Sequence, residues 1–265
     1  MIESLNSPHV ARVKALIGSR GVKERKSTGE FVAEGLQCAR EALVSAKAPQ
    51  IKTLYLTSKG RAKVEEFADL SHVNVVDVSD EVMKQMSETI TPQGVIAICS
   101  IPQNDLSAVA LNGARRFVYL SEIQDPGNAG TILRSADAFA MDAVITSPGS
   151  VDMYSPKVVR STAGSLWHIP VFESVKIEEV LDLGVIAFSL GATGTKSLNE
   201  YQPVGDTVAV FGNEARGLST SQQVDSIEVV RISMPGNAES LNLSAAASIV
   251  MYHLSNMPRP QSSSR

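Results

Sequence analysis

Cysteine, histidine and clustered metal ligands are scarce in this sequence. Its two cysteines, Cys38 and Cys99, belong to no CxxC pair and have no histidine beside them. We therefore expect reduced, buried thiols, and neither a disulfide framework nor a zinc site. The four histidines are equally scattered, so no metal site is predicted.

Long apolar runs are also missing. The sequence contains no apolar stretch of about 18 residues, and its first 30 residues hold no run that resembles a signal peptide. The sequence therefore predicts no membrane-spanning segment, and we expect a cytoplasmic protein. The chain has 265 residues, of which 43% are hydrophobic and 20% charged, as is typical of a globular protein with one large or two ordinary domains.

Several common enzyme motifs are absent as well. The loop DPGNAG has a single GxxG, and no acidic residue stands about 20 positions on to hold a ribose, so a Rossmann-type dehydrogenase or methyltransferase is disfavoured. The sequence contains no P-loop lysine motif, GxSxG elbow or HExxH. The common NTPase and hydrolase classes therefore lose support.

Positive charge is concentrated at the N-terminus. The net charge is -4, but residues 1–30 carry six cations and three carboxylates, which gives +3 and leaves -7 for the remainder. Such a cluster is typical either of a solvated helix followed by a loop or of an arm that contacts RNA phosphates. The predicted RNA-binding residues are Arg12, Lys14, Arg20, Lys23, Arg25 and Lys26.

Alternating strand and helix patterns begin at residue 29. Strands are predicted at 51–58, 73–79 and 95–101, with a helix at about 60–68 between the first two. These segments describe a compact α/β unit that ends near Ile101. Residues 102–113 contain proline, asparagine and glycine, and are predicted to form a linker with one helical turn.

A second α/β unit opens with the apolar strand 116–123. The loop QDPGNAGT follows, then a helix at about 129–140 and the strand DAVITSP. In such a unit the loop lies at the carboxyl edge of a parallel sheet, where ligands bind. Asn128 is placed to cap the helix, and Arg134 lies on its early turns, so this loop favours an anion.

Three later strands also run into polar or glycine-containing loops. They are predicted at 184–193, 208–211 and 227–234, and the last leads to SLNLSAAASIVMYHL at 240–254. In that stretch Ser240, Leu241 and Asn242 precede a helix that begins with small residues. Its exposed N–H groups favour an anion or a carbonyl, although an ordinary capped helix has the same pattern.

Three of these stretches together resemble a known family. SEIQDPGNAGTILRSADAF at 121–139, VAVFGNEARGLS at 208–219 and ISMPGNAESLNLSAAASIVMYHL at 232–254 are similar to the three motifs of the SpoU, or TrmH-type, branch of the SPOUT RNA methyltransferases. Residues 29–101, with FVAEG and TPQGVIAI, resemble the L30e-like substrate-binding domain that precedes it in many members. Ser233 stands where many relatives carry proline.

The resemblance implies an α/β fold in which a parallel sheet contains a deep trefoil knot. It implies five segments: a basic arm at 1–28, an L30e-like domain at 29–101, a linker at 102–113, a SPOUT domain at 114–258 and a disordered tail at 259–265. It also implies a homodimer formed through the C-terminal domain, with S-adenosylmethionine as methyl donor. The implied cofactor-binding residues are Leu190, Gly191, Gly212, Ile232, Met234 and Leu241, and the implied catalytic residues are Asn128, Arg134, Glu214, Ser240 and Asn242.

The implied reaction is methyl transfer to a ribose 2'-hydroxyl, with 23S ribosomal RNA favoured over transfer RNA because of the separate first domain. In the family the counterpart of Arg134 is proposed as the base. A guanidinium holds its proton, so we expect Arg134 to anchor phosphate instead, oriented by Asn128, Asn242 and Glu214. The alternatives are a transfer RNA 2'-O-methyltransferase, a base methyltransferase and a catalytically silent RNA-binding protein. The sequence leaves a housekeeping and an antibiotic-resistance role equally open.

Overall fold

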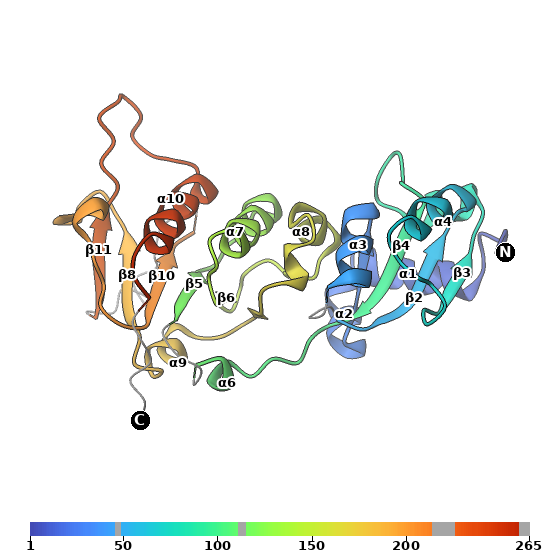
Figure 1. Cartoon of the computed structure of the whole chain (residues 1–265), viewed down its shortest axis with the longest axis horizontal. Helices are drawn as coiled ribbons and strands as arrows, with labels where there is room; N and C mark the ends of the chain where they lie inside the picture. The colour runs from blue at the N-terminus through green and yellow to red at the C-terminus, as the bar shows by residue number, and fades with distance from the viewer. Residues whose placement is uncertain (46–48, 111–114, 214–225, 260–265) are drawn as a thin grey trace. The chain divides into compact units, whose positions relative to one another are not determined.

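The chain divides into two compact units. The computed structural model describes residues 1–45, 49–110, 115–213 and 226–259 (Figure 1). Unit 1 comprises Met1–Gln103 and Asp152–His168, and unit 2 comprises Asn104–Val151 and Ile169–Arg265. The segment Asp152–His168 was predicted as part of the C-terminal domain, but its contacts group it with unit 1.

Unit 1 is built on a four-stranded sheet of order β1-β4-β2-β3. Strand β4 pairs antiparallel with both β1 and β2, whereas β2 pairs parallel with β3. The three strands predicted in this region are present with shorter bounds, as β2 (Ile51–Leu56), β3 (Val75–Asp77) and β4 (Val95–Ser100). Strand β1 (Glu30–Glu34) was not predicted.

Strand β1 shows how the sheet of unit 1 is covered on both faces. Successive side chains point to opposite faces. Val32 joins a core cluster with residues of helices α1 and α5, whereas the ring of Phe31 packs against Tyr154 and Trp167. The helical elements of unit 1 are α1 (Pro8–Ile17), α2 (Gly21–Thr28), α3 (Leu36–Val44), α4 (Ser58–Glu65), α5 (Asp80–Met86), α8 (Pro156–Ser161) and the 3-10 turn η1 (Ser165–Trp167).

The N-terminal residues are part of this core and not a separate arm. Ser7 caps α1 by accepting a hydrogen bond from the backbone of Val10. Val10, Val13 and Leu16 lie on the buried side of α1 and pack into the same cluster as Val32. The predicted boundary at residue 28 is therefore wrong, because the amphipathic pattern of α1 buries one face against the sheet.

Unit 2 is built on a seven-stranded sheet in which every described pairing is parallel. Its order is β7-β6-β5-β10-β8-β11-β9. The parallel sheet predicted from the resemblance is confirmed. The strands are β5 (Arg116–Leu120), β6 (Ala143–Thr146), β7 (Val171–Phe172), β8 (Ile186–Leu190), β9 (Lys196–Ser197), β10 (Thr207–Phe211) and β11 (Ile227–Arg231).

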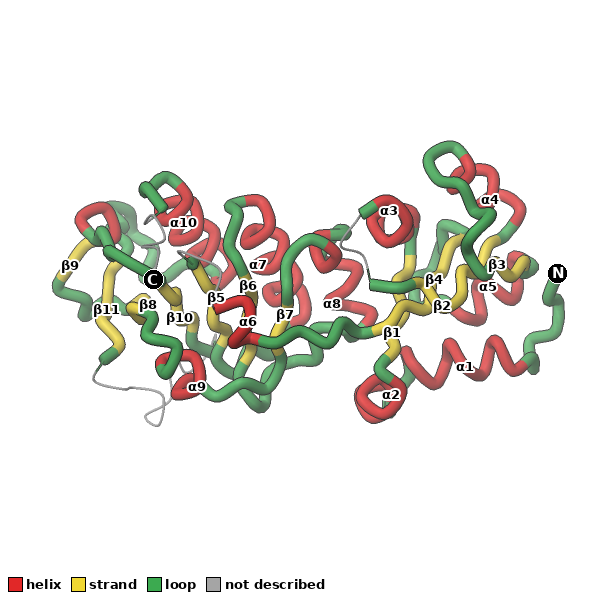
Figure 2. Tube along the Cα trace, turned by 60° about the horizontal axis from the view of Figure 1, so that its bottom comes forward, coloured by secondary structure: helices red, strands yellow, loops and turns green. Residues whose placement is uncertain are grey.

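Helices cover both faces of this sheet, as Figure 2 shows. One core cluster joins the side chains of one face of β5, β6, β8 and β10 to α9 and to the partly buried side of α6. On α7 and α10 the residues that face inward are small or aliphatic and buried. The helical elements of unit 2 are α6 (Leu106–Ala110), α7 (Pro126–Ala138), α9 (Ile177–Leu181), the 3-10 turn η2 (Leu198–Glu200) and α10 (Leu243–Ser255). None of the described helices of either unit has the length and apolarity needed to span a membrane.

The chain crosses itself at β11. Strands β8 and β9 follow one another in sequence, yet β11 lies between them in the sheet and pairs with both. The five residues that join them, 191–195, must therefore pass across β11. A Cβ atom on Gly194 would lie 2.7 Å from the carbonyl carbon of Val230 and 2.8 Å from the nitrogen of Arg231. This crossing supports the trefoil knot, which stays a prediction.

We predict that Gly194→Ala destabilises unit 2. The added methyl group meets backbone atoms, which cannot rotate away, so the crossing must shift at a cost of about 1–3 kcal/mol, as for other overpacked sites. The matched control is Gly236→Ala, because a Cβ atom there meets no atom within 4 Å. Thermal unfolding of the two variants measures the difference, and equal melting temperatures would contradict the close crossing.

Candidate functional site

Three strand ends meet at one edge of the sheet of unit 2. Strands β10, β8 and β11 are neighbours and run parallel, so their carboxyl ends lie together. Four of the predicted cofactor-binding residues follow directly from these ends. They are Leu190 and Gly191 at the end of β8, Gly212 after β10 and Ile232 after β11.

The remaining predicted cofactor residues add apolar surface in the segment between β11 and α10. Met234 and Leu241 are each 38% exposed, although both side chains are large and apolar. Gly191 donates its backbone N–H to the carbonyl of Val230 at 3.0 Å, which fixes the start of the crossing segment. Backbone polar groups at strand ends together with exposed apolar side chains suit a nucleoside bearing a sulfonium, so the predicted cofactor fits this edge.

Helix α7 begins three residues earlier than predicted. Its cap is Asp125, whose carboxylate accepts the backbone N–H of Asn128 at 2.7 Å, and Pro126 occupies the first turn. Proline suits that position because its missing N–H would have no helical partner. Asn128 was predicted as the cap and is instead a residue of the first turn. Its side chain is thereby available to contact another helix.

Asn128 and Asn242 are joined across the two helices that pack side by side on this face (Figure 1). Asn242 caps α10: its Oδ1 accepts the N–H groups of Ser244 and Ala245 at 2.9 and 3.3 Å. Because Oδ1 faces helical donors, the amide orientation is fixed, and Nδ2 donates to Oδ1 of Asn128 at 3.1 Å. One turn or more further along, the hydroxyls of Ser135 and Ser248 lie 2.8 Å apart.

The other predicted catalytic residues do not join this pair. Arg134 is exposed on α7 and forms no ion pair or hydrogen bond with any residue in the described parts of the chain. It lies six positions after Asn128, about 240° around the helix at 100° per residue, and so on another side. Ser240 is exposed in the segment before α10. Glu214 lies outside the described residues.

Asn213 is a buried residue of this edge that was not predicted from the sequence. Its side chain is 9% exposed and donates to the carbonyl of Glu122 at 2.9 Å. Glu122 has a left-handed backbone (φ 49°) and donates its N–H to Ser147. These contacts hold the loop between β5 and α7 against the ends of β6 and β10. The left-handed conformation of a glutamate leaves no signal in a sequence.

The predicted RNA-binding residues differ in burial and pairing. Arg25 is buried, with 3% of its surface exposed, and its guanidinium contacts Asp152 at 2.7 Å and the carbonyl of Leu16. It is unavailable to RNA, so its prediction as a phosphate contact is wrong. Arg12 is paired with Glu24 and Glu30. The remaining four, Lys14, Arg20, Lys23 and Lys26, are exposed.

Comparison with known proteins defines the class. Residues 115–252 match the SpoU rRNA Methylase family, and residues 8–97 match the MRM3-like substrate binding domain. The chain therefore belongs to the SpoU rRNA methylase family, and the resemblance inferred from its three motifs is confirmed. The second match begins at Pro8, in agreement with the inclusion of α1 in unit 1.

Particular relatives resemble the chain over most of their lengths. The 23S rRNA (guanosine(2553)-2'-O)-methyltransferase RlmP of Bacillus subtilis is 32% identical over 235 residues, which cover 88% of this chain and 91% of that protein. The AdoMet-bound rRNA methyltransferase of Sinorhizobium meliloti has a TM-score of 0.82 at 27% identity, covering 95% of each chain. AviRb of Streptomyces viridochromogenes, also solved with AdoMet, has a TM-score of 0.82 at 25% identity over 94% of this chain and 97% of that one.

We predict that Arg25→Ala destabilises unit 1. It leaves the Asp152 carboxylate, whose side chain is 10% exposed, without its cation. Breaking a buried pair on one side typically costs about 3–5 kcal/mol. Denaturant unfolding measures the change, with Lys26→Ala as the control, since Lys26 is an exposed cation of the same helix. An Arg25→Ala variant as stable as Lys26→Ala would show that the pair contributes nothing.

Proposed function

We propose that this chain transfers a methyl group from S-adenosylmethionine to a ribose 2'-hydroxyl of ribosomal RNA. The observation that carries the proposal is the linked pair Asn128–Asn242, held at 3.1 Å between α7 and α10 in a member of the SpoU family. The relative RlmP is named for 2'-O-methylation of 23S rRNA. A chain that methylates ribosomal RNA works where that RNA is assembled, so we also propose a cytoplasmic location.

The chain's own contribution is placement. When bound, S-adenosylmethionine supplies a methyl group on a sulfonium, which is already a strong electrophile. The ends of β8, β10 and β11 supply backbone groups to hold it, with Met234 and Leu241 as the apolar lining. What remains is to orient the attacking hydroxyl and to exclude water, and fixed side chains accomplish this best.

Asn242 is such a fixed side chain. Its Oδ1 is occupied by α10 and its Nδ2 by Asn128, so Asn242 cannot turn without breaking the cap of α10, and Asn128 cannot turn without losing its hydrogen bond to Asn242. We assign this pair to positioning the ribose that accepts the methyl group. An amide does not take up a proton at neutral pH, so the pair supplies geometry and not acid–base chemistry.

We assign Arg134 to the phosphate beside the target ribose. A guanidinium keeps its proton at neutral pH, so it is a poor base, whereas its planar fork of donors suits a phosphate. Arg134 is exposed on α7. It therefore has room for an RNA ligand.

We predict that Arg134→Lys lowers the rate of methyl transfer about 10²-fold, as expected for the loss of an oriented donor in the transition state. Labelled methyl from S-adenosylmethionine is followed into ribosomal RNA and, separately, transfer RNA, with nucleoside analysis after digestion. A labelled 2'-O-methylnucleoside from ribosomal RNA is expected. A labelled base, or label in transfer RNA alone, would overturn the proposed methylation of a ribose in ribosomal RNA. Normal turnover by the Arg134→Lys variant would overturn the assignment of Arg134 to a phosphate.

We propose further that the active form is a homodimer in which Arg134 serves the partner's site. Arg134 and the Asn128–Asn242 pair lie on different sides of α7, so a single RNA nucleotide is better served by two copies. The helices also expose apolar surface: Ile249 is 40% and Tyr252 60% exposed on α10. The ring of Tyr252 stands edge-on to Phe139 at the end of α7.

Complementation tests this arrangement. Arg134→Ala and Asn242→Ala are each expected to be inactive alone. A dimer containing one copy of each has one site with both residues if Arg134 acts in trans, which predicts about half of the wild-type activity, since a symmetric dimer has two equal sites. If Arg134 acts within its own chain, no mixed dimer regains activity. Differently tagged copies, co-expressed and purified through both tags, provide the sample.

A further inference from the structure

Two motifs from the sequence analysis, FVAEG and TPQGVIAI, remain without a role, and the structure brings them together. Gln93 accepts the backbone N–H of Leu36 at 2.8 Å through its side-chain oxygen, which ties the loop before β4 to the start of α3. The same end of the loop is held a second time, because Gly94 lies against Gly60, where a Cβ atom would meet the carbonyl oxygen of Gly94. At the other end, the hydroxyl of Ser87 donates to the carboxylate of Glu34. Residues 87–94 therefore form a loop held at its base.

Two hollows flank this loop, and Thr91 and Gln93 line both. We call the first the lysine pocket. It has a volume of about 380 Å³, and it is lined by Thr57, Lys59, Lys63, Asp80, Met83, Lys84, Thr91, Pro92, Gln93 and Gly94. We call the second the amide pocket. It has a volume of about 370 Å³, and it is lined by Glu34, Gly35, Gln37, Cys38, Thr89, Thr91, Gln93, Arg160 and Ala163.

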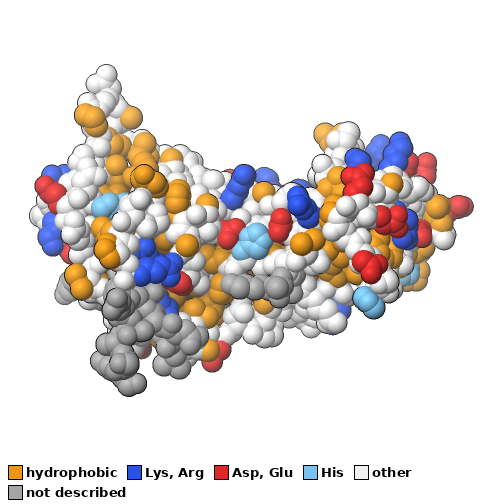
Figure 3. All heavy atoms as spheres, in the orientation of Figure 1, with side chains coloured by type: hydrophobic (Ala, Val, Ile, Leu, Met, Phe, Trp, Pro, Cys, Tyr) orange, Lys and Arg blue, Asp and Glu red, His pale blue; other side chains and the backbone are white. Residues whose placement is uncertain are grey.

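The lysine pocket carries unbalanced positive charge. Three lysines face one carboxylate, Asp80, and none of the three forms an ion pair with a residue that the structure describes. Lys59 and Lys63 lie one turn apart on α4, where like charges repel. In Figure 3, basic side chains gather on the surface over α4, with acidic ones beside them. By contrast Arg61 of the same helix is balanced by Asp77 and Glu65. A bound polyanion would relieve the repulsion.

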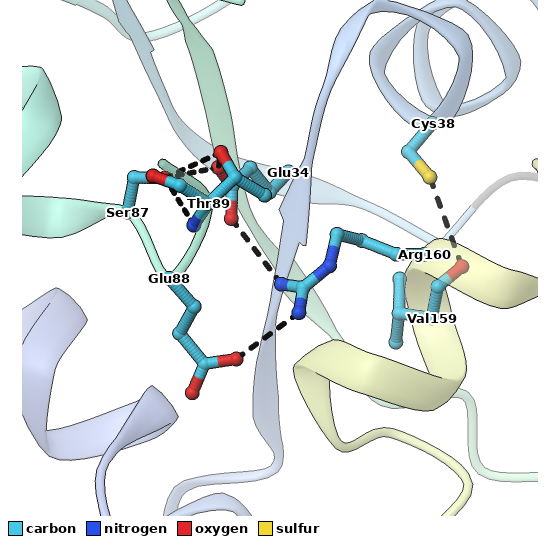
Figure 4. A network of polar contacts seen from close by, with 7 residues as sticks. All are labelled: Glu34, Cys38, Ser87, Glu88, Thr89, Val159 and Arg160. Carbon is cyan, nitrogen blue, oxygen red and sulfur yellow. Dashed lines mark hydrogen bonds and ion pairs between the residues drawn. The ribbon is translucent and has the colours of Figure 1, made fainter. Parts of the chain in front are cut away.

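The amide pocket is of the opposite kind. As Figure 4 shows, the Glu34 carboxylate accepts hydrogen bonds from the hydroxyls of Ser87 and Thr89. It also forms an ion pair with Arg160, which pairs with Glu88 as well. Two carboxylates around one guanidinium leave a net negative charge, which repels a phosphate. Burial raises the pKa of Cys38 to about 11, so its thiol is neutral. The amides of Gln37 and Gln93 are exposed. Nε2 of Gln37 donates to Glu41 and Oε1 of Gln93 accepts from Leu36, and the groups that remain, Oε1 of Gln37 and Nε2 of Gln93, form a neutral surface that suits the edge of a nucleobase.

We propose that the loop 87–94 reads the RNA substrate, with backbone phosphates in the lysine pocket and an unpaired base in the amide pocket beside it. The inference rests on the proposed function, and it adds where and how the first unit holds its RNA. The two hollows share Thr91 and Gln93 as lining residues, so one nucleotide in contact with this loop can place its phosphate in the first and its base in the second. A base that enters a pocket must be unpaired, so the site selects a loop or bulge over a continuous duplex.

The first experiment compares two sets of three lysines. The triple variant Lys59→Ala, Lys63→Ala and Lys84→Ala is expected to bind an unmodified 23S rRNA transcript at least tenfold more weakly. The slope of log affinity against log salt should fall by about 2, at roughly 0.7 per lost contact. The comparison set is Lys14→Ala, Lys23→Ala and Lys26→Ala, which removes the same charge from exposed positions of α1 and α2, where the sequence predicts phosphate contacts. An equal or larger loss of affinity in this set would overturn the proposal.

The second experiment separates base from phosphate. Gln37→Ala is expected to weaken binding of the transcript while leaving the salt slope unchanged, because it removes no cation. Annealing DNA oligonucleotides along the loops of the transcript should abolish the difference between this variant and wild type. A change in slope, or no change in affinity, would reject the amide pocket. Binding of S-adenosylmethionine and methylation by wild type are measured in parallel, so a failed methyltransferase assay and a failed RNA site remain distinguishable.

Discussion

The crossing of the segment 191–195 over β11 is the constraint on which unit 2 depends. Because β11 lies between β8 and β9, the chain cannot leave β8 and return to the sheet without passing over it, and Gly194 permits the approach. The same placement puts the ends of β8 and β11 side by side. The edge of backbone groups that we propose for the cofactor is thus a consequence of this crossing, and it needs few specific side chains.

Much of this arrangement was predictable from local pattern. Apolar runs before glycine or polar loops marked β5, β8 and β10, and the small residues after Asn242 marked α10. The pattern did not reveal β9, which has two residues, or the crossing itself, since no periodicity encodes the passage of one segment over another. The threading and the cofactor residues came from the family resemblance alone. The error at Asn128 has a simple source: the Asp125–Pro126 start is a stronger helix signal than an asparagine two residues later.

The N-terminal cations show why charge counts mislead. In the sequence Arg25 and Lys26 are neighbouring cations of one basic run. In the structure Arg25 is buried against Asp152, a residue 127 positions away, whereas Lys26 is exposed. Pairing with a distant carboxylate converts a cation that was predicted to contact RNA into part of the core. Arg12 and Arg61 are likewise balanced by carboxylates. A basic surface must therefore be defined by the cations that remain after pairing.

By that criterion the acidic net charge and an RNA substrate are compatible. Long-range repulsion by a net charge of -4 is screened over roughly 8 Å at physiological salt, so an RNA near the surface responds to the charges it meets locally. Lys59, Lys63 and Lys84 supply a positive local field in the lysine pocket, whereas Glu34 and Glu88 around Arg160 leave an excess negative charge beside the amide pocket. The resulting difference in electrostatic potential between the two pockets orients a nucleotide. Its phosphate is drawn to the lysines while its uncharged base is left to the amides, which is a physical basis for reading RNA without a strongly basic protein.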